Sequence, residues 1–311
     1  MNKYLLPLVC LFLFPLLLLS QSNLTYVPDD NFENYLEANG MGDGIPLNDS
    51  VLTSNINSVY SLNVSSLQIS DLTGIEDFSL LDDLNCGSNQ LTNIDLSNNI
   101  YLNYVDCSHN QITNLDITNN YLLTHLSCFN NLLSSINSNG ANALSTLLCH
   151  DNQLSSIDLS FNLNLSFLEC NFNQFDSLDL NSNSALTFLN CSDNQLISLN
   201  LSNGNNTNIY VFNSTNNSSL TFICVDDSIY STNNWINIDP QQYFSANCTS
   251  QSFGCTDPLA LNYNSLANIS DSSCIYCTND TSYTITHACD SLLWNGDWYD
   301  STGTYYHNFN N

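Results

Sequence analysis

Six cysteines recur at a constant interval of 21 residues, and this spacing constrains the fold more than any other feature of the chain. A fixed period of this length is typical of repeat proteins, in which each repeat is one structural unit stacked on the next. The six positions are Cys86, Cys107, Cys128, Cys149, Cys170 and Cys191. Because a single repeat cannot bury its apolar side alone, only the stack is expected to be stable.

The residues around each cysteine recur as well. Leu84 and Cys86 are two residues apart, so they share one face of a short strand, while Asn85 and Gly87 occupy the other. Stacked strands form a parallel sheet in which neighbours are about 4.8 Å apart. A disulfide requires its Cβ atoms to be about 3.8 Å apart. We therefore expect these cysteines to remain reduced and to fill the core.

An asparagine follows each of these cysteines by three residues, at the turn that ends the strand. Its side-chain amide is suited to bonding the backbone groups that a turn leaves unpaired. The set consists of Asn89, Asn110, Asn131, Asn152, Asn173 and Asn194. We assign these asparagines a structural role beside the cysteines.

This pattern resembles the leucine-rich-repeat family, with cysteine at an interior position that is usually leucine. Degenerate copies between Ile56 and Ile75 have the spacing of internalin-like repeats. The resemblance implies a repeat solenoid, a horseshoe with a parallel β-sheet on its concave face and partners bound there. It points to secreted proteins of the Bacteroidetes type, and the chain is expected to be a fragment of a longer type IX-secreted surface protein.

The first 22 residues resemble a signal peptide, because a basic start is followed by an apolar run and a small-x-small cleavage site. The alternatives are a retained membrane anchor, for which the run is short, and a lipoprotein processed at Cys10. Residues 23–50 resemble a helical cap in which Asp30 caps the helix and Glu33 is its third helical residue. The helix is expected to stop at Asn39 and Gly40.

The array with its closing segment is predicted over residues 51–250, and two small disulfide-bounded β or irregular modules are predicted after it. Residues 254–276 resemble a short cysteine-bounded module in which Ser270 to Ser273 replaces the usual acidic turn, which weakens the case for a cation site near Asp257 and Asp271. Residues 277–311 resemble an incomplete β-rich surface-protein repeat.

The six cysteines outside the ladder and the leader suit disulfides in an oxidising compartment. The expected pairs are Cys224–Cys248, which resembles the staple of a closing segment, Cys255–Cys274 and Cys277–Cys289. The alternative for the last four cysteines is a zinc site. That alternative has one CxxC spacing, between Cys274 and Cys277.

The charge balance excludes two classes of partner. Lys3 is the only Lys or Arg in the chain, against 29 acidic residues. Nucleic acid is excluded because its phosphates require Lys and Arg, and anionic membrane surfaces are excluded for the same reason. The acidity suits a medium rich in salt or divalent cations, although solubility alone also accounts for it.

A second repeated column is acidic. Its members are Asp95, Asp116, Asn137, Asp158, Asp179 and Asn200. We expect each carboxylate to accept backbone hydrogen bonds in its own turn, with calcium as the weaker alternative. The glycine-rich pattern of a calcium roll is missing from the sequence.

The sequence does not predict an enzyme or a cofactor. It contains no nucleophile elbow, phosphate-binding glycine loop or His-Glu-x-x-His motif. The histidines at 109, 125 and 150 are interpreted as ordinary surface residues.

The outward residues of the predicted strands are the candidate binding site. They include aromatic and apolar side chains with no role in the core, which are typical of an interface. The candidates are Tyr104, His125, Phe129, Leu148, Phe167 and Phe188. Scattered surface aromatics, or coverage by the tail, are the alternatives. We expect a secreted or cell-surface module for adhesion or protein binding, with glycan binding or a structural spacer as alternatives and the oligomeric state open.

Overall fold

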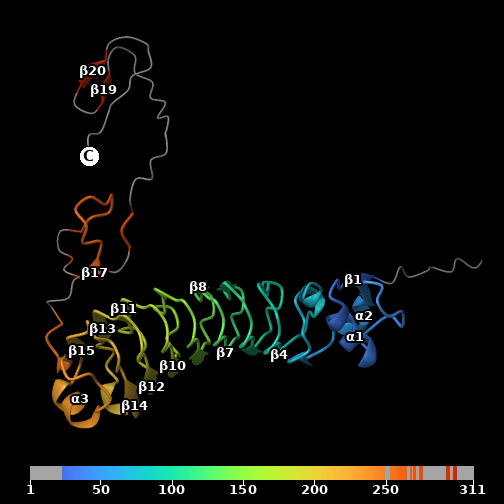
Figure 1. Cartoon of the computed structure of the whole chain (residues 1–311), viewed down its shortest axis with the longest axis horizontal. Helices are drawn as coiled ribbons and strands as arrows, with labels where there is room; N and C mark the ends of the chain where they lie inside the picture. Colours follow the sequence, from blue (N-terminus) through green and yellow to red (C-terminus); the bar gives the residue numbers. More distant parts are fainter. Residues whose placement is uncertain are drawn as a thin grey trace, which may run out of the picture.

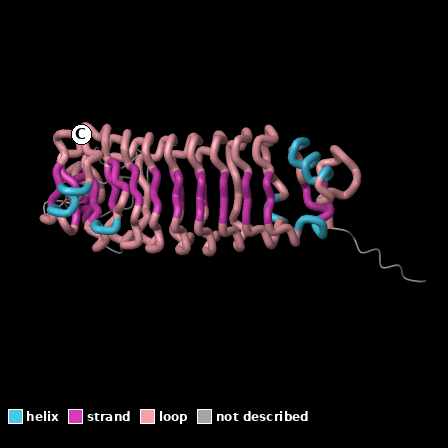
Figure 2. Tube along the Cα trace, turned by 90° about the horizontal axis from the view of Figure 1, so that it is seen from below, coloured by secondary structure: helices cyan, strands magenta, loops and turns pink. Residues whose placement is uncertain are grey.

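The structure is a computed structural model that describes residues 23–248, 253–264, 267, 269–270, 273–275, 292–294 and 297–299. Over residues 23–248 the chain forms a solenoid of stacked coils (Figure 1). Figure 2 shows a row of strands along one side of these coils. The predicted parallel-sheet solenoid is therefore confirmed. The expected signal peptide at 1–22, including Cys10, lies outside the described residues.

The main sheet has eight parallel strands in the spatial order β14-β12-β10-β9-β7-β5-β4-β3. Their bounds are β3 Ser61–Asn63, β4 Asp83–Asn85, β5 Tyr104–Asp106, β7 His125–Ser127, β9 Thr146–Leu148, β10 Phe167–Glu169, β12 Phe188–Asn190 and β14 Val211–Asn213. The strands pair one coil apart, so that Leu84 lies beside Val105 and Leu147 beside Leu168. These inward residues are fully buried, and each contributes about 1.5–3 kcal/mol through burial.

The six cysteines follow the strands directly and are free and buried. Backbone pairing continues through them, because the Cys86 N–H donates to the Asp106 carbonyl at 2.8 Å. Burial raises the pKa of the Cys107, Cys149 and Cys191 thiols to about 12, so they are protonated at neutral pH. They act as small apolar side chains in the core.

The asparagine three residues after each cysteine links two coils. Asn131 Nδ2 donates to the carbonyl of Cys107 at 3.0 Å and to that of Cys128 at 3.1 Å, and its Oδ1 accepts the N–H of Ile112 at 2.9 Å. The preceding residue, Asn130, has a φ of 53°, which bends the chain sharply at this point. The same turn recurs in the other repeats, and Asn217 extends the set by one coil beyond the predicted six.

The N-terminal cap contains the antiparallel strands β1 and β2 and the helices α1 and α2. Their bounds are β1 Leu24–Tyr26, α1 Asp30–Ala38, β2 Ser50–Leu52 and α2 Thr53–Ile56. The expectation that Asp30 caps α1 is wrong by one residue. Asp29 is the cap and accepts the N–H groups of Asn31 and Phe32, at 3.0 and 3.1 Å. Its second oxygen accepts the N–H of Ser70 at 2.8 Å, which ties the cap to the array.

The side of the coils opposite the main sheet has less regular pairing. It holds one sheet of two parallel strands and one of four. The bounds of these strands are β6 Asn114–Asp116, β8 Ser135–Asn137, β11 Ser177–Asp179, β13 Ser198–Leu201, β15 Phe222–Val225 and β16 Tyr243–Ser245. The array also contains two short 3-10 helices, η1 Ile75–Asp77 and η2 Asn206–Asn208. A second set of buried asparagines, Asn99, Asn120, Asn162 and Asn183, bonds backbone carbonyls between coils here.

The closing segment covers the last coil with aromatic residues. Helix α3, Ser228–Asn234, begins at the cap Asp227. Trp235, the residue after this helix, stacks on Phe212 with ring centroids 4.5 Å apart. Trp235 also meets Phe244 edge-on, with ring centroids 5.4 Å apart, which closes the aromatic stack. A disulfide joins Cys224 to Cys248, with Cα atoms 5.4 Å apart.

The described part of the tail contains four short strands. Their bounds are β17 Phe253–Gly254, β18 Ile269–Ser270, β19 Leu292–Trp294 and β20 Asp297–Tyr299. A second disulfide joins Cys255 to Cys274. The expected pair Cys277–Cys289 lies outside the described residues, as does Asp271. Among the helices in the described part of the chain, none has the length and apolar character needed to cross a membrane.

Candidate binding surface

The outward side of the main sheet presents two side chains from each strand. The middle residue of each three-residue strand is buried, and the first and third point away from the core, as alternation along a strand requires. We call this surface the strand face. It is formed by the outward residues of the main-sheet strands β4, β5, β7, β9, β10 and β12 and by the turn residues that follow these strands. The outward strand residues are Asp83, Asn85, Tyr104, Asp106, His125, Ser127, Thr146, Leu148, Phe167, Glu169, Phe188 and Asn190.

The first outward position carries two stacked ring pairs. Tyr104 on β5 stacks on His125 on β7, with centroids 4.7 Å apart and planes 9° from parallel. Phe167 on β10 stacks on Phe188 on β12 at 3.9 Å and 9°. Parallel register explains this geometry, since equivalent residues on neighbouring strands are about 4.8 Å apart, close to the preferred separation of stacked rings.

A second row of rings lies in the turn that follows the strands. Phe129 stacks on His150 with centroids 4.5 Å apart and planes 9° from parallel. His109 meets the same Phe129 ring edge-on at 5.0 Å. The row therefore joins three successive repeats.

All six predicted binding residues lie on the strand face and are half-buried. Five of them take part in the stacked pairs, and the sixth, Leu148, is the outward third residue of β9. Stacking covers one face of each of the five rings, so they are less open to water than isolated surface rings. The stacking roles of His109 and His150 were not predicted from the sequence, although both residues lie one repeat away from Phe129.

Carboxylates surround the first ring pair. Burial, and then the charges of Asp106 and Asp83, raise the pKa of the Tyr104 phenol. Burial lowers the pKa of His125, and the Asp106 charge only partly offsets this effect. His125 is therefore held in its neutral form to a lower pH than a solvated histidine.

His150 is the only residue in the described part of the chain that forms an ion pair when protonated. Its Nδ1 lies 3.9 Å from a Glu169 oxygen, and its Nε2 lies 3.9 Å from an Asp151 oxygen. The sequence has no Lys or Arg after Lys3. The strand face thus carries carboxylates that no permanent cation of the described chain neutralises.

The acidic column lies on the side opposite the strand face. Asp95, Asp116 and Asn137 line a shallow groove of about 630 Å³ there. Each aspartate accepts the N–H of the residue two positions on, as Asp116 does from Thr118 at 2.9 Å. A hydrogen bond from Ser97 lowers the pKa of Asp95. These bonds give each carboxylate a structural role in its own turn.

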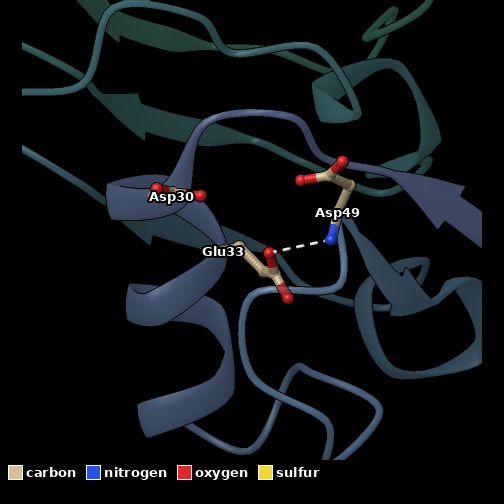
Figure 3. A group of neighbouring side chains, drawn as sticks. All are labelled: Asp30, Glu33 and Asp49. Carbon is tan, nitrogen blue, oxygen red and sulfur yellow. Dashed lines mark hydrogen bonds between the residues drawn. The ribbon is translucent and has the colours of Figure 1, made fainter.

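A carboxylate cluster in the cap was not predicted. Oxygens of Asp30, Glu33 and Asp49 lie within 4.8 Å of one another. Figure 3 shows Glu33 reaching from α1 to the loop at Asp49. The two oxygens of this buried side chain accept the N–H groups of Asn48 and Asp49, at 2.9 and 3.1 Å. The Glu33 side chain therefore anchors the loop before β2. In a capping box it would instead accept the backbone N–H of the cap residue.

The disulfide between Cys255 and Cys274 bears on the alternative of a zinc site in the tail. Zinc binds cysteine as the thiolate, so the two paired cysteines are not available as ligands. The other two cysteines of that alternative, Cys277 and Cys289, lie outside the described residues.

No protein-family model matches the chain, and comparison with curated proteins finds no match. Solved structures with a similar fold include an internalin C2 from Listeria monocytogenes, at 18% identity and a TM-score of 0.48 over 71% of this chain and 98% of that one. A leucine-rich-repeat protein of Leptospira interrogans is similar at 18% identity and a TM-score of 0.49, over 61% and 55%. The functional domain of InlJ from Listeria monocytogenes, which includes a cysteine ladder, is similar at 20% identity and a TM-score of 0.27, over 72% and 70%.

The class of the fold is defined by the chain's own repeat: a buried strand, an inward cysteine and an amide-bonded turn in each coil of about 21 residues. This is a leucine-rich-repeat solenoid. Stacking of the coils gives such a solenoid extended surfaces.

Proposed function

We propose that this protein is an extracellular or cell-surface binding module that recognises a protein partner through the strand face. The stacked ring pairs carry the proposal. Packing of the core does not require rings at outward positions, yet Tyr104, Phe167 and Phe188 lie there in register. Half-buried aromatic side chains held by their neighbours are well suited to act as interface anchors.

Two features support an extracellular location. The disulfides Cys224–Cys248 and Cys255–Cys274 suit an oxidising compartment. The same location is supported by the leader-like residues 1–22. It is also supported by residues 254–276 and 277–311, which resemble modules of type IX-secreted Bacteroidetes proteins. In this proposal the array of 51–250 binds and the cap of 23–50 closes its first coil.

The test begins with a screen of the chain from residue 23 onward against surface proteins and against glycans. For any protein partner, Phe167→Ala and Phe188→Ala should each weaken binding by about 2 kcal/mol or more if the ring is a true anchor. Melting should change little, as expected for substitutions outside the core. Calorimetric titration measures the affinity, and circular dichroism measures the melting temperature.

Phe161→Ala is the matched control. This ring is 56% exposed and lies outside the strand face, so its removal should leave the affinity intact. A double variant of Phe167 and Phe188 that binds every identified partner as tightly as the wild type would show that the strand face is not the site. The tail after Gly254 would then become the better candidate.

Glycan binding is the second candidate, because amides of Asn171 and Asn190 lie on the strand face near the rings and bond one another at 3.0 Å. Sugar stacking requires an open ring face. Phe167 and Phe188 cover each other's facing surfaces at 3.9 Å, which leaves only their outer faces. This geometry favours a protein partner, and the glycan arm of the screen tests it.

A further inference from the structure

Building on the proposed function, we infer that the strand face binds an extended, cationic segment of its protein partner. Two ring-and-carboxylate pairs, Tyr104 with Asp106 on β5 and Phe167 with Glu169 on β10, each receive one Lys or Arg side chain. The two pairs set the spacing of the cations in that segment.

Each pair is built by the alternation of a strand. The ring is the first residue and the carboxylate the third, so both project from the same face. Among the eight strands of the described sheet, β5 and β10 alone combine an aromatic first residue with an acidic third one. A ring face attracts a cation through its quadrupole, and a carboxylate beside it adds direct attraction.

The part of the chain that the structure describes offers no permanent cation to these carboxylates. Both hydrogen bonds to Asp106 come from Ser108 and use Oδ1, at 3.0 Å from the backbone N–H and 2.6 Å from the hydroxyl. Glu169 faces His150 at 3.9 Å, which is an ion pair only when the histidine is protonated. A permanent cation for these carboxylates therefore comes from outside the described array.

A third carboxylate strengthens the first pair. Asp83 on β4 lies directly beside Tyr104 in the sheet register, on the side away from His125. His125 covers one face of the Tyr104 ring at 4.7 Å. The other face is turned toward the strand that carries Asp83, so a cation seated on this face meets a ring and two carboxylates.

The spacing of the pairs fits an extended chain that crosses the strands. β5 and β10 are separated by three strand steps, through β7 and β9, which amounts to about 14 Å at roughly 4.8 Å per step. An extended chain rises about 3.4 Å per residue, so four residues also span about 14 Å. Residues i and i+4 of such a chain point to the same side. The expected signature is therefore Lys or Arg at i and i+4.

The test uses the chain from residue 23 onward and three fluorescein-labelled peptides with Ser, Thr and Gly between their charged positions. One peptide has Lys at i and i+4, one has Lys at i and i+3, and one has Glu at i and i+4. Fluorescence anisotropy should show binding of the i,i+4 lysine peptide at least about threefold tighter than of the i,i+3 peptide. The glutamate peptide should not bind. These are modest effects, as exposed charge pairs and cation–π contacts usually give.

Asp106→Asn and Glu169→Gln should each weaken the i,i+4 complex by about threefold or more. Both substitutions keep the size of the side chain, and the amide introduced by Asp106→Asn retains an oxygen that can accept the Ser108 bonds. Asp158→Asn is the matched control, because it removes one charge from an exposed position on the opposite side of the coils. It should leave the affinity unchanged, and the melting temperature of each variant verifies folding.

Three outcomes would overturn the inference. Equal affinities for the two lysine spacings would remove the two-site geometry. Equal losses in Asp158→Asn and Glu169→Gln would reduce binding to general attraction by a chain with 29 acidic residues. Binding of free propylamine as tight as that of the peptide would identify small amines as the ligand. If Phe167→Ala instead weakens a partner that lacks a cationic segment, the proposed function stands and only this inference fails.

Discussion

The two sides of each coil are built from similar short strands and turns but are held together differently. On one side, eight parallel strands form a single sheet that runs from β3 to β14. On the other, the strands form separate sheets of two and four. Both sides use buried asparagines to bond carbonyls between coils. The six-membered cysteine ladder, and the asparagine ladder that Asn217 extends by one coil, belong to the side of the main sheet.

This difference between the two sides of the coil determines which of them can vary in sequence. Where the main sheet satisfies the backbone and the inward ladder fills the core, the first outward position of each strand has no hydrogen-bonding role in its turn. The third outward position keeps one, since Asp106 accepts the N–H of Ser108. The first outward positions carry Tyr104, His125, Phe167 and Phe188. On the opposite side Asp116 bonds the backbone of its own turn, as Asp106 does on the strand face, so the two surfaces differ in the rings of the first outward position.

The largest effect is expected where a ladder asparagine is removed. Asn131→Ala leaves the buried N–H of Ile112 without its partner. The carbonyls of Cys107 and Cys128 each lose one of two amide donors and keep the bond from Asn110 or Asn152. The unsatisfied N–H costs about 1–3 kcal/mol, and the loss of the two further hydrogen bonds adds to this. The free energy of unfolding should fall by about 2–4 kcal/mol, measured by urea denaturation with an unchanged slope.

Asp116→Ala provides the comparison on the opposite side. This exposed carboxylate accepts one N–H, that of Thr118, and water can replace it. The cost should be below about 1 kcal/mol. If the two substitutions lower the free energy of unfolding equally, the two sides of the coil depend to the same extent on their side-chain hydrogen bonds.

Cys149→Ser tests the interior beneath the main sheet. The thiol is fully buried and packs as a small apolar group, whereas a hydroxyl requires a hydrogen-bond partner there. The free energy of unfolding should fall by about 1–3 kcal/mol. A change within error would show that this position tolerates a polar atom.

The same ladder predicts a labelling result. Alkylation of the unfolded, unreduced chain from residue 23 onward, followed by peptide mapping, should modify the six ladder cysteines and leave Cys224, Cys248, Cys255 and Cys274 unmodified. Labelling of the native chain at neutral pH should be very slow, because burial raises the thiol pKa of Cys107 to about 12 and shifts the other ladder thiols in the same direction. Absence of label in the unfolded chain would contradict the reduced ladder.

The interior of the array could be predicted from the sequence because its constraint is periodic. The same side chain must fit the same place in each coil, so Cys86 and Asn89 are found again every 21 residues. The second asparagine set was equally visible at Asn99 and Asn120, but Ala141 interrupts it after two members. A broken period gives a much weaker signal than an intact one.

The cap and the strand face were less predictable because their contacts are not periodic. Asp29 and Asp30 are adjacent carboxylates of equal capping propensity, and the choice between them depends on Ser70, which lies 41 residues away in sequence. The ring positions follow from alternation, but the pairing of Phe129 with His150 depends on the path of the turn after each strand. Sequence alone gives the positions of such side chains and not their contacts.

A smaller effect is expected from pH at the strand face. The pKa of His125 is lowered by burial from its ordinary value of 6.5, so the unfolded state binds more protons than the folded state between 6.5 and the folded pKa. The stabilisation by neutral His125 is complete above pH 6.5 and is lost as pH falls through this window. His125→Gln should remove that part of the slope in denaturation curves measured at several pH values. An unchanged slope would show that another group is responsible.

The smallest difference is expected between calcium and sodium. The chain is strongly acidic, so any salt screens its self-repulsion and raises the melting temperature slightly. A specific calcium site would add stabilisation that rises with occupancy, because the ion would bind the folded state alone. Asp95 and Asp116 line one groove, but each already accepts a backbone N–H in its own turn. We therefore expect millimolar calcium and sodium chloride of equal ionic strength to shift melting equally, in the wild type and in the double variant Asp95→Asn, Asp116→Asn. A larger rise in melting temperature with calcium than with sodium, abolished in this variant, would show that the opposite side binds calcium. Asp95 and Asp116 would then bind the ion as well as bond their own turns.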